Sequence, residues 1–185
     1  TERSIDKDQA IRANADLASL EKLKPVFRPD GVITAGNASP LSAGAGGILL
    51  MSLKTALEKG LKPKAVIRSI GFSGVDPTLM GIGPVPASRM ALEKAGLKVE
   101  NIDFWEINEA FSVVALNCIQ ELAIEPERVN VHGGGVALGH PLGATGVRLV
   151  GSLARILEER NGRFGCATAC IGGGQGIAVI LERVT

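Results

Sequence analysis

Residues 163–183, RFGCATACIGGGQGIAVILER, contain the pattern that decides the fold. Two apolar segments, 163–171 and 176–183, lie on either side of a glycine triplet at 172–174. Apolar runs of this length that are joined by glycines are typical of two antiparallel strands and a tight turn. We therefore expect the chain to end in a β-hairpin.

Upstream of this hairpin, strand and helix signals alternate along the chain. The expected strands are 64–73, 103–107 and 129–131, and the expected helices are 84–94, 111–122 and 144–159. Valine and isoleucine mark the first strand, whereas apolar residues at i, i+3 and i+4 mark the second helix. The order βαβαβαββ predicts an α/β domain with a five-stranded mixed sheet, mostly parallel with one antiparallel strand, and helices on both faces.

The remaining segments are assigned from their polarity and their glycines. Residues 1–36 are mostly polar and are expected to form an irregular extension or linker, which leaves 37–185 as the folded domain. Residues 43–59 are predicted to form a buried helix that ends at Gly60. The apolar face of the 144–159 helix is expected to comprise Val147, Val150, Ala154 and Leu157.

Composition excludes several classes of function. The chain has 185 residues, which is enough for one domain with a real core. A net charge of +1 and an aromatic content of 3% argue against nucleic-acid binding, and no apolar run is long enough to span a membrane. The three cysteines lack metal-ligand spacing, so we expect no metal, no disulfide framework and a reducing compartment such as the cytoplasm.

His140 is the first candidate for catalysis. It stands in GGGVALGHPLGATG, residues 133–146, directly before an expected helix. The N–H groups at a helix N-terminus disfavour an imidazolium, so a neutral imidazole that accepts protons is expected here. The alternative is an ordinary loop histidine. His132, the other histidine, is expected to be structural.

Cys170 is the second candidate, and Gly172 is considered with it. Cys170 closes an expected strand two residues before Gly172, and residues at this spacing point the same way in an extended chain. A thiol and a backbone N–H would then share one reaction centre. Cys118 and Cys166 are expected to be inert packing residues.

Asn108 is the third candidate, and two interpretations of it stay open. It follows the strand signal at 103–107 and precedes an expected helix, so it is either an N-cap or an amide that holds a water or a carbonyl oxygen. In the first case Glu109 is a favourable first-turn acid. The glycine run at 172–176 lacks the lysine and the following helix of a phosphate loop, so nucleotide binding is not expected.

These motifs form a set when they are taken in order with TAGNASPL (34–41), MGIGPVPASR (80–89) and NEAF (108–111). The set resembles the C-terminal half of the thiolases, specifically the acetyl-CoA C-acetyltransferase type. The resemblance implies a thiolase-fold C-terminal domain. It also implies condensation or thiolysis of 3-ketoacyl-CoA through an acyl-cysteine, with coenzyme A thioesters as substrates and no tightly bound cofactor.

The same resemblance assigns roles to individual residues. His140 would activate the nucleophilic cysteine, and Cys170 would remove the α-proton of the second acyl-CoA. Asn108, through a water, and His140 would form one oxyanion hole, and the N–H of Gly172 would contribute to the other. The residues implied to line the pantetheine channel are Ser39, Met80 and Phe111.

The resemblance covers only the second of two similar halves, and the nucleophilic cysteine belongs to the first. None of the three cysteines occupies its motif, so we expect this chain alone to be inactive. The expected partners are an N-terminal thiolase half and further copies of the chain. One alternative is a decarboxylating ketoacyl synthase of the same fold, which needs a histidine or asparagine at Cys170. The other is an inactive fragment or split-enzyme subunit that binds coenzyme A thioesters.

Overall fold

The computed structural model describes residues 4, 6–8 and 11–184, and its centre is a four-stranded sheet in the order β1-β4-β3-β2. The strands are β1 (Ala65–Gly74), β2 (Phe104–Ile107), β3 (Phe164–Ile171) and β4 (Gln175–Arg183). β3 pairs antiparallel with β4 across the glycine turn, so the predicted hairpin is confirmed. No helix among the described residues has the length and apolar character needed to cross a membrane.

The predicted strand count and direction are wrong in part. Of the three strand pairings only β2–β3 is parallel, whereas β1–β4 and β3–β4 are antiparallel. The expected strand at 129–131 is reduced to one isolated bridge between Val129 and Trp105. Asn130 ends the pairing because its φ of 48° is left-handed. Its side-chain amide replaces the next ladder bonds, accepting from the N–H of Ile107 at 2.8 Å and donating to its carbonyl at 2.9 Å.

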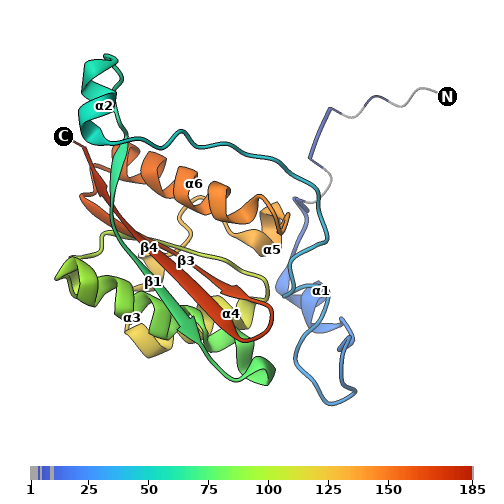
Figure 1. Cartoon of the computed structure of the whole chain (residues 1–185). Helices are drawn as coiled ribbons and strands as arrows, with labels where there is room; N and C mark the ends of the chain where they lie inside the picture. Colours follow the sequence, from blue (N-terminus) through green and yellow to red (C-terminus); the bar gives the residue numbers. More distant parts are fainter. Residues whose placement is uncertain (1–3, 5, 9–10, 185) are drawn as a thin grey trace.

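Helices cover both faces of the sheet, as predicted. α3 (Pro84–Ala95) and α4 (Ser112–Leu122) lie on one face, and α6 (Thr145–Glu159) lies on the other (Figure 1). The period-two alternation of the strands divides the core: Cys166 and Ile180 pack with α3 and α4, whereas Ala167 and Leu181 pack with α6. The shorter helices are α1 (Leu17–Glu21), α2 (Leu53–Glu58), α5 (Gly135–Leu138), η1 (Pro77–Ile82), η2 (Val99–Asn101) and η3 (Pro126–Arg128).

The predicted buried helix at 43–59 is wrong. Only α2 is helical, and residues 41–52, which we call the strap, run as an exposed segment across α6 (Figure 1). A Cβ on Gly44 would lie 2.8 Å from Cγ of Pro141, and one on Gly46 would lie 2.9 Å from Cγ1 of Val147. The glycines therefore let the strap backbone lie against the start of α6 and the loop before it. Their low helix propensity also disfavours the predicted helix.

The predicted apolar face of α6 is only partly the face that packs on the sheet. Only Leu157 of the four predicted residues is fully buried. Val150 and Ala154 are partly buried at the margin of the core. The residues that α6 buries completely or almost so are Thr145, Leu149, Leu153, Ile156 and Leu157. Leu149, Leu153 and Leu157 pack on the sheet, whereas Val150 and Ala154 line a groove between α6, β1 and the strap.

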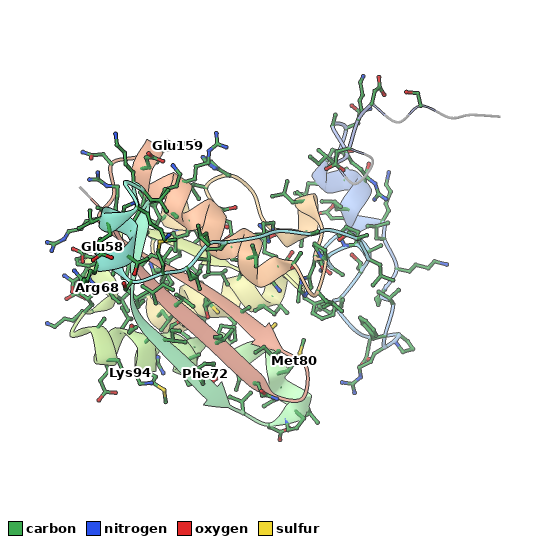
Figure 2. The ribbon with its side chains drawn as sticks, turned by 45° about the horizontal axis from the view of Figure 1, so that its top comes forward. Glu58, Arg68, Phe72, Met80, Lys94 and Glu159 are labelled. Carbon is green, nitrogen blue, oxygen red and sulfur yellow. The ribbon has the colours of Figure 1, made fainter. Side chains whose placement is uncertain are left out.

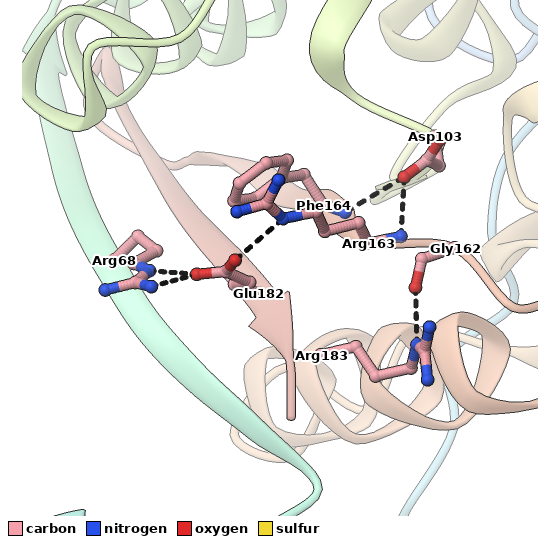
Figure 3. Close-up of polar contacts among 7 residues, drawn as sticks. All are labelled: Arg68, Asp103, Gly162, Arg163, Phe164, Glu182 and Arg183. Carbon is pink, nitrogen blue, oxygen red and sulfur yellow. Dashed lines mark hydrogen bonds and ion pairs between the residues drawn. The ribbon is translucent and has the colours of Figure 1, made fainter. Parts of the chain in front are cut away.

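A polar network fixes the end of the sheet opposite to Cys170 (Figure 3). Glu182 of β4 pairs with Arg68 of β1, and it accepts a hydrogen bond at 2.8 Å from Nε of Arg163, just before β3. The Arg163 bond is the main reason why the pKa of Glu182 is lowered. The carboxylate of Asp103 accepts from the backbone N–H of Arg163 and Phe164 at 2.7 and 2.9 Å. These contacts hold the strands in register while the other end of the sheet carries the candidate site.

Candidate active site

The candidate site lies where β2 and β3 end. These strands are parallel, so their carboxyl ends meet at one edge of the sheet. Asn108 directly follows β2, and Cys170 is the second-last residue of β3. The loop between α5 and α6 brings His140 to Asn108. The structure thus gathers two of the three motifs in direct contact and places the third on the neighbouring strand.

Asn108 is fully buried and holds His140. Its side-chain nitrogen lies 3.3 Å from Nε2 of His140, and its backbone N–H donates to Thr168 of β3 at 2.9 Å. The N-cap interpretation is wrong, because α4 begins at Ser112 and Phe111 occupies the cap position. The side-chain oxygen of Asn108 has no hydrogen-bond partner among the described residues. The amide of Asn108 faces the imidazole of His140, and the interpretation that it holds a water or a carbonyl oxygen stays a prediction.

Glu109 connects two segments of the chain through hydrogen bonds and does not lie in the first turn of α4. Its carboxylate accepts hydrogen bonds from the side-chain amide of Asn130 at 2.7 Å and from the N–H of Val136 at 3.1 Å. A Cβ on Gly134 would lie 2.0 Å from Cδ of Glu109, so this approach requires glycine. Glu109 thereby ties the end of β2 to the glycine loop that leads to His140. Sequence reasoning missed Asn130, because no local pattern links it to residues 107–109.

His140 is half-buried, and both ring nitrogens have partners. Nδ1 lies 2.7 Å from the hydroxyl oxygen of Thr145, the first residue of α6. Burial lowers the pKa of His140, and the cation of Arg148 lowers it further. The neutral imidazole that the sequence predicted is thus favoured, although through burial and Arg148 instead of through the helix terminus alone. His132 lies apart from the site, with its Nε2 3.3 Å from a carboxylate oxygen of Glu159.

A buried charged pair beside the site was also missed. Nη1 of Arg148 lies 4.0 Å from Oε2 of Glu106, whose side chain is 1% exposed. Burial raises the pKa of Glu106 to about 7, against the opposing effect of Arg148. Oε1 of Glu106 and two guanidinium nitrogens of Arg148 have no hydrogen-bond partner among the described residues. The sequence signal that could have indicated this pair is Glu106, a glutamate inside the otherwise apolar strand β2.

Cys170 is buried at 8% exposure, and burial raises the pKa of its thiol. Within the described residues it makes no hydrogen bond with His140 or Asn108. Gly172 is exposed in the turn after β3, so the shared reaction centre of thiol and N–H stays a prediction. Cys118 and Cys166 are fully buried in the core, as predicted, and all three cysteines are free.

Of the residues expected along the pantetheine channel, Met80 lies in a short helix, whereas Ser39 and Phe111 lie outside the helices and strands. The backbone and the hydroxyl of Ser39 both donate to the carbonyl of Ala110, at 3.0 and 3.1 Å, which sets Ser39 beside Phe111. Met80 lies in η1, which packs on α4 and approaches the turn between β3 and β4 (Figure 2). No group of three or more potential metal ligands is found in the described part of the chain.

Two family models match the chain. The model "Thiolase, C-terminal domain" matches residues 61–183, and "Thiolase, N-terminal domain" matches residues 1–54. The expectation that the resemblance covers only the C-terminal half is corrected for residues 1–54, which the N-terminal model matches, and the predicted boundary after residue 36 stays a prediction. The first 54 residues contain no cysteine, and all three cysteines lie in the part matched by the C-terminal model.

Individual relatives agree with the family models. The chain is 48% identical to the 3-ketoacyl-CoA thiolase of Klebsiella pneumoniae and 47% identical to that of Salmonella typhimurium, in each case over 98% of this chain and 48% of the relative. It therefore spans about half the length of these curated relatives.

Solved structures show the same fold. The acetyl-CoA acetyltransferase of Bacillus anthracis matches with a TM-score of 0.93 at 48% identity, over 96% of this chain and 45% of that structure. Human mitochondrial 3-ketoacyl-CoA thiolase in complex with CoA matches with a TM-score of 0.88 at 41% identity, with the same coverage. The expectation of a thiolase fold is confirmed, and the chain belongs to the thiolase family.

Proposed function

We propose that this domain supplies the acid–base and oxyanion groups for acyl transfer between coenzyme A thioesters. The observation that carries the proposal is the contact between buried Asn108 and half-buried His140 at the carboxyl ends of β2 and β3, with Cys170 on the adjacent strand. The reaction would be condensation of two acyl-CoA molecules or, in reverse, thiolysis of 3-ketoacyl-CoA. Family membership and the CoA complex of a human relative support this substrate class.

In the proposed acylation step, Nε2 of His140 accepts the thiol proton of a cysteine supplied from outside these 185 residues. The resulting thiolate attacks the thioester carbonyl, and the bond between that carbon and the CoA sulfur breaks. The departing CoA thiolate takes the proton of Cys170, which is left as a thiolate. The raised pKa of Cys170 suits both roles, because the thiol holds its proton near neutral pH and its thiolate is a stronger base.

In the proposed condensation step, the Cys170 thiolate removes an α-proton from the second acyl-CoA. The enolate oxygen is held by the His140 imidazolium and, through a water, by the Asn108 amide. The enolate attacks the acyl-cysteine, whose oxyanion accepts from the N–H of Gly172, and the nucleophilic thiolate leaves. It regains its proton from His140, so every group returns to its starting state.

The proposal also covers how the substrate binds, which chains are partners and in which compartment the protein works. We assign Ser39, Met80 and Phe111 to the pantetheine channel, with coenzyme A entering and leaving as a substrate. The hydroxyl of Ser39 is already engaged by Ala110, so Ser39 would shape the channel wall. We further propose that the N-terminal half and a second copy of the chain are partners. The three free cysteines fit a reducing compartment such as the cytoplasm.

Separate roles for His140 and Cys170 provide the test. With a nucleophile-bearing half supplied, Cys170→Ala should still be acylated by acetyl-CoA but should fail to exchange α-protons. His140→Ala should be acylated slowly, with losses of about 10² to 10⁴, as is typical of a positioned acid or base. Intact mass and deuterium exchange at the acetyl methyl measure the two steps. The surface variant His132→Ala is the control. If Cys170→Ala blocked acylation and left exchange intact, the assignment would be reversed.

A second candidate function is a module that binds coenzyme A thioesters without turnover. It is favoured by the absence of cysteine from residues 1–54. Without a nucleophile no acyl-cysteine forms. We therefore expect the purified chain alone to leave acetoacetyl-CoA and coenzyme A unconverted, as followed by the enolate absorbance. Turnover that disappears in Cys170→Ala would show that Cys170 has a different role.

A further inference from the structure

The geometry points to Thr145 as a positioning residue that holds His140 in the tautomer protonated on Nδ1, which leaves Nε2 unprotonated. This inference deepens the proposed function, because it rests on Nε2 of His140 acting as the proton acceptor. Which ring nitrogen carries the proton is set by the partners of both nitrogens. The structure provides one partner on each side of the ring.

The first partner is the hydroxyl of Thr145, which is 2% exposed. Its oxygen lies 2.7 Å from Nδ1 of His140 and 3.1 Å from the carbonyl of Pro141, to which the hydroxyl donates. A hydroxyl has a single hydrogen. When that hydrogen points to Pro141, four residues back as is common for threonine in a first helical turn, the oxygen accepts from Nδ1–H.

The second partner is the side-chain nitrogen of Asn108, 3.3 Å from Nε2 of His140. An amide NH₂ group is a donor only, so the nitrogen that it faces must present its lone pair. Both neighbours therefore select the same tautomer. The opposite tautomer requires two changes together: the Asn108 amide must turn over, and the Thr145 hydrogen must point to Nδ1.

This tautomer suits the proposed chemistry at both stages. The unprotonated Nε2 can exchange its contact with the Asn108 amide for the thiol proton of the nucleophile. The resulting imidazolium keeps its Nδ1–H bond to Thr145 and directs Nε2–H at the enolate oxygen. Thr145 stands at the start of a 15-residue helix, so its hydroxyl is fixed by the fold rather than by a mobile loop.

The chain itself suffices for the main experiment. Long-range proton–nitrogen correlation spectra distinguish a protonated from a bare imidazole nitrogen, at a pH where the ring is neutral. The surface variant His132→Gln leaves His140 as the single histidine, so that every imidazole signal in the spectrum belongs to His140. We expect Nδ1 to give the protonated signature and Nε2 the bare one. Thr145→Val should weaken this preference, which Asn108 then supports alone, and Thr145→Ser, which keeps the hydroxyl, should retain it.

Spectra of the unmutated site that show Nε2 protonated would overturn the inference, as would a Thr145→Val spectrum that matches the parent. If Thr145→Val fails to fold, the parent and Thr145→Ser spectra still decide the question. With the nucleophile-bearing half added, acylation by Thr145→Val should slow by about 10²-fold, in kcat more than in KM, and Thr145→Ser should restore it. Confirmed spectra with no acylation in any variant would reject the proposed function but keep the tautomer.

Discussion

At the residue scale, the unusual feature is a carboxylic acid in the core beside the site. Glu106 sits on β2 with its side chain 1% exposed, and Arg148 is 4.0 Å away, too far for a hydrogen bond. The loss of hydration is thus only partly compensated. The pKa of Glu106 rises from 4.5 to about 7 for this reason.

This shift predicts how stability depends on pH. Between pH 4.5 and about 7 the folded state retains a proton on Glu106 that the unfolded state releases. The contribution of Glu106 to the free energy of unfolding therefore falls as pH rises through this window, by about 3 kcal/mol at most. Glu106→Gln should remove this slope, so that the variant gains stability relative to the parent as pH rises.

Urea unfolding of the chain at several pH values within this window measures the effect. The exposed variant Glu58→Gln controls for the loss of one carboxylate. Parallel stability curves for Glu106→Gln and the parent across the window would show that Glu106 does not titrate there.

At the element scale, glycines decide how closely α3 approaches the sheet. A Cβ on Gly71 of β1 would lie 2.1 Å from the carbonyl oxygen of Ala87, and one on Gly176 of β4 would lie 2.1 Å from that of Gly83. These obstacles are backbone atoms, which cannot swing aside as a flexible side chain would. The helix start and the strand therefore depend on glycine for their contact.

Gly176→Ala should accordingly destabilise the chain by about 1–3 kcal/mol, the usual cost of overpacking. Gly151→Ala is the matched control, because a Cβ there meets no atom within 4 Å and the position lies inside α6. That control should be neutral or should stabilise by about 0.5–1 kcal/mol, since alanine favours a helix. Denaturation midpoints compare the two variants. Equal midpoints would mean that the backbone of α3 shifts freely to make room.

At the scale of the whole molecule, apolar surface is left uncovered. In the strap, Leu49 and Leu50 are 77% and 68% exposed, and Phe72 on the outer strand β1 is 57% exposed. The strap, β1 and α6 also enclose an apolar groove of about 630 Å³. Apolar patches of this kind mark interfaces or cause aggregation.

We therefore expect the chain to form dimers or larger species at micromolar concentration, as measured by sedimentation. Replacing Leu49 and Leu50 together by serine should weaken the association, because less apolar area is then buried in the contact. Substitution of Lys54, an exposed charge next to the strap, serves as the control. A clean monomer that binds no hydrophobic dye would contradict this prediction.

The sequence by itself determined the features that depend on neighbouring residues. Prolines in the first turn and Gly96 at the end bound α3, and the glycine triplet places the hairpin. The motifs also singled out His140 and Asn108, whose side chains the structure brings within 3.3 Å of each other. Each of these signals is read within a few residues of the element that it marks, which is why a linear pattern suffices.

Only the tertiary structure decided the features that depend on distant partners. The expected strand at 129–131 does not form, because the side-chain amide of Asn130 is hydrogen-bonded to Ile107, which is 23 positions away in the sequence. The strap stays extended because Gly44 lies against Pro141, and Glu106 meets Arg148 only when β2 and α6 pack together. Hydrogen bonds and close packing between remote segments override local propensity here, and no linear pattern records which segments will meet.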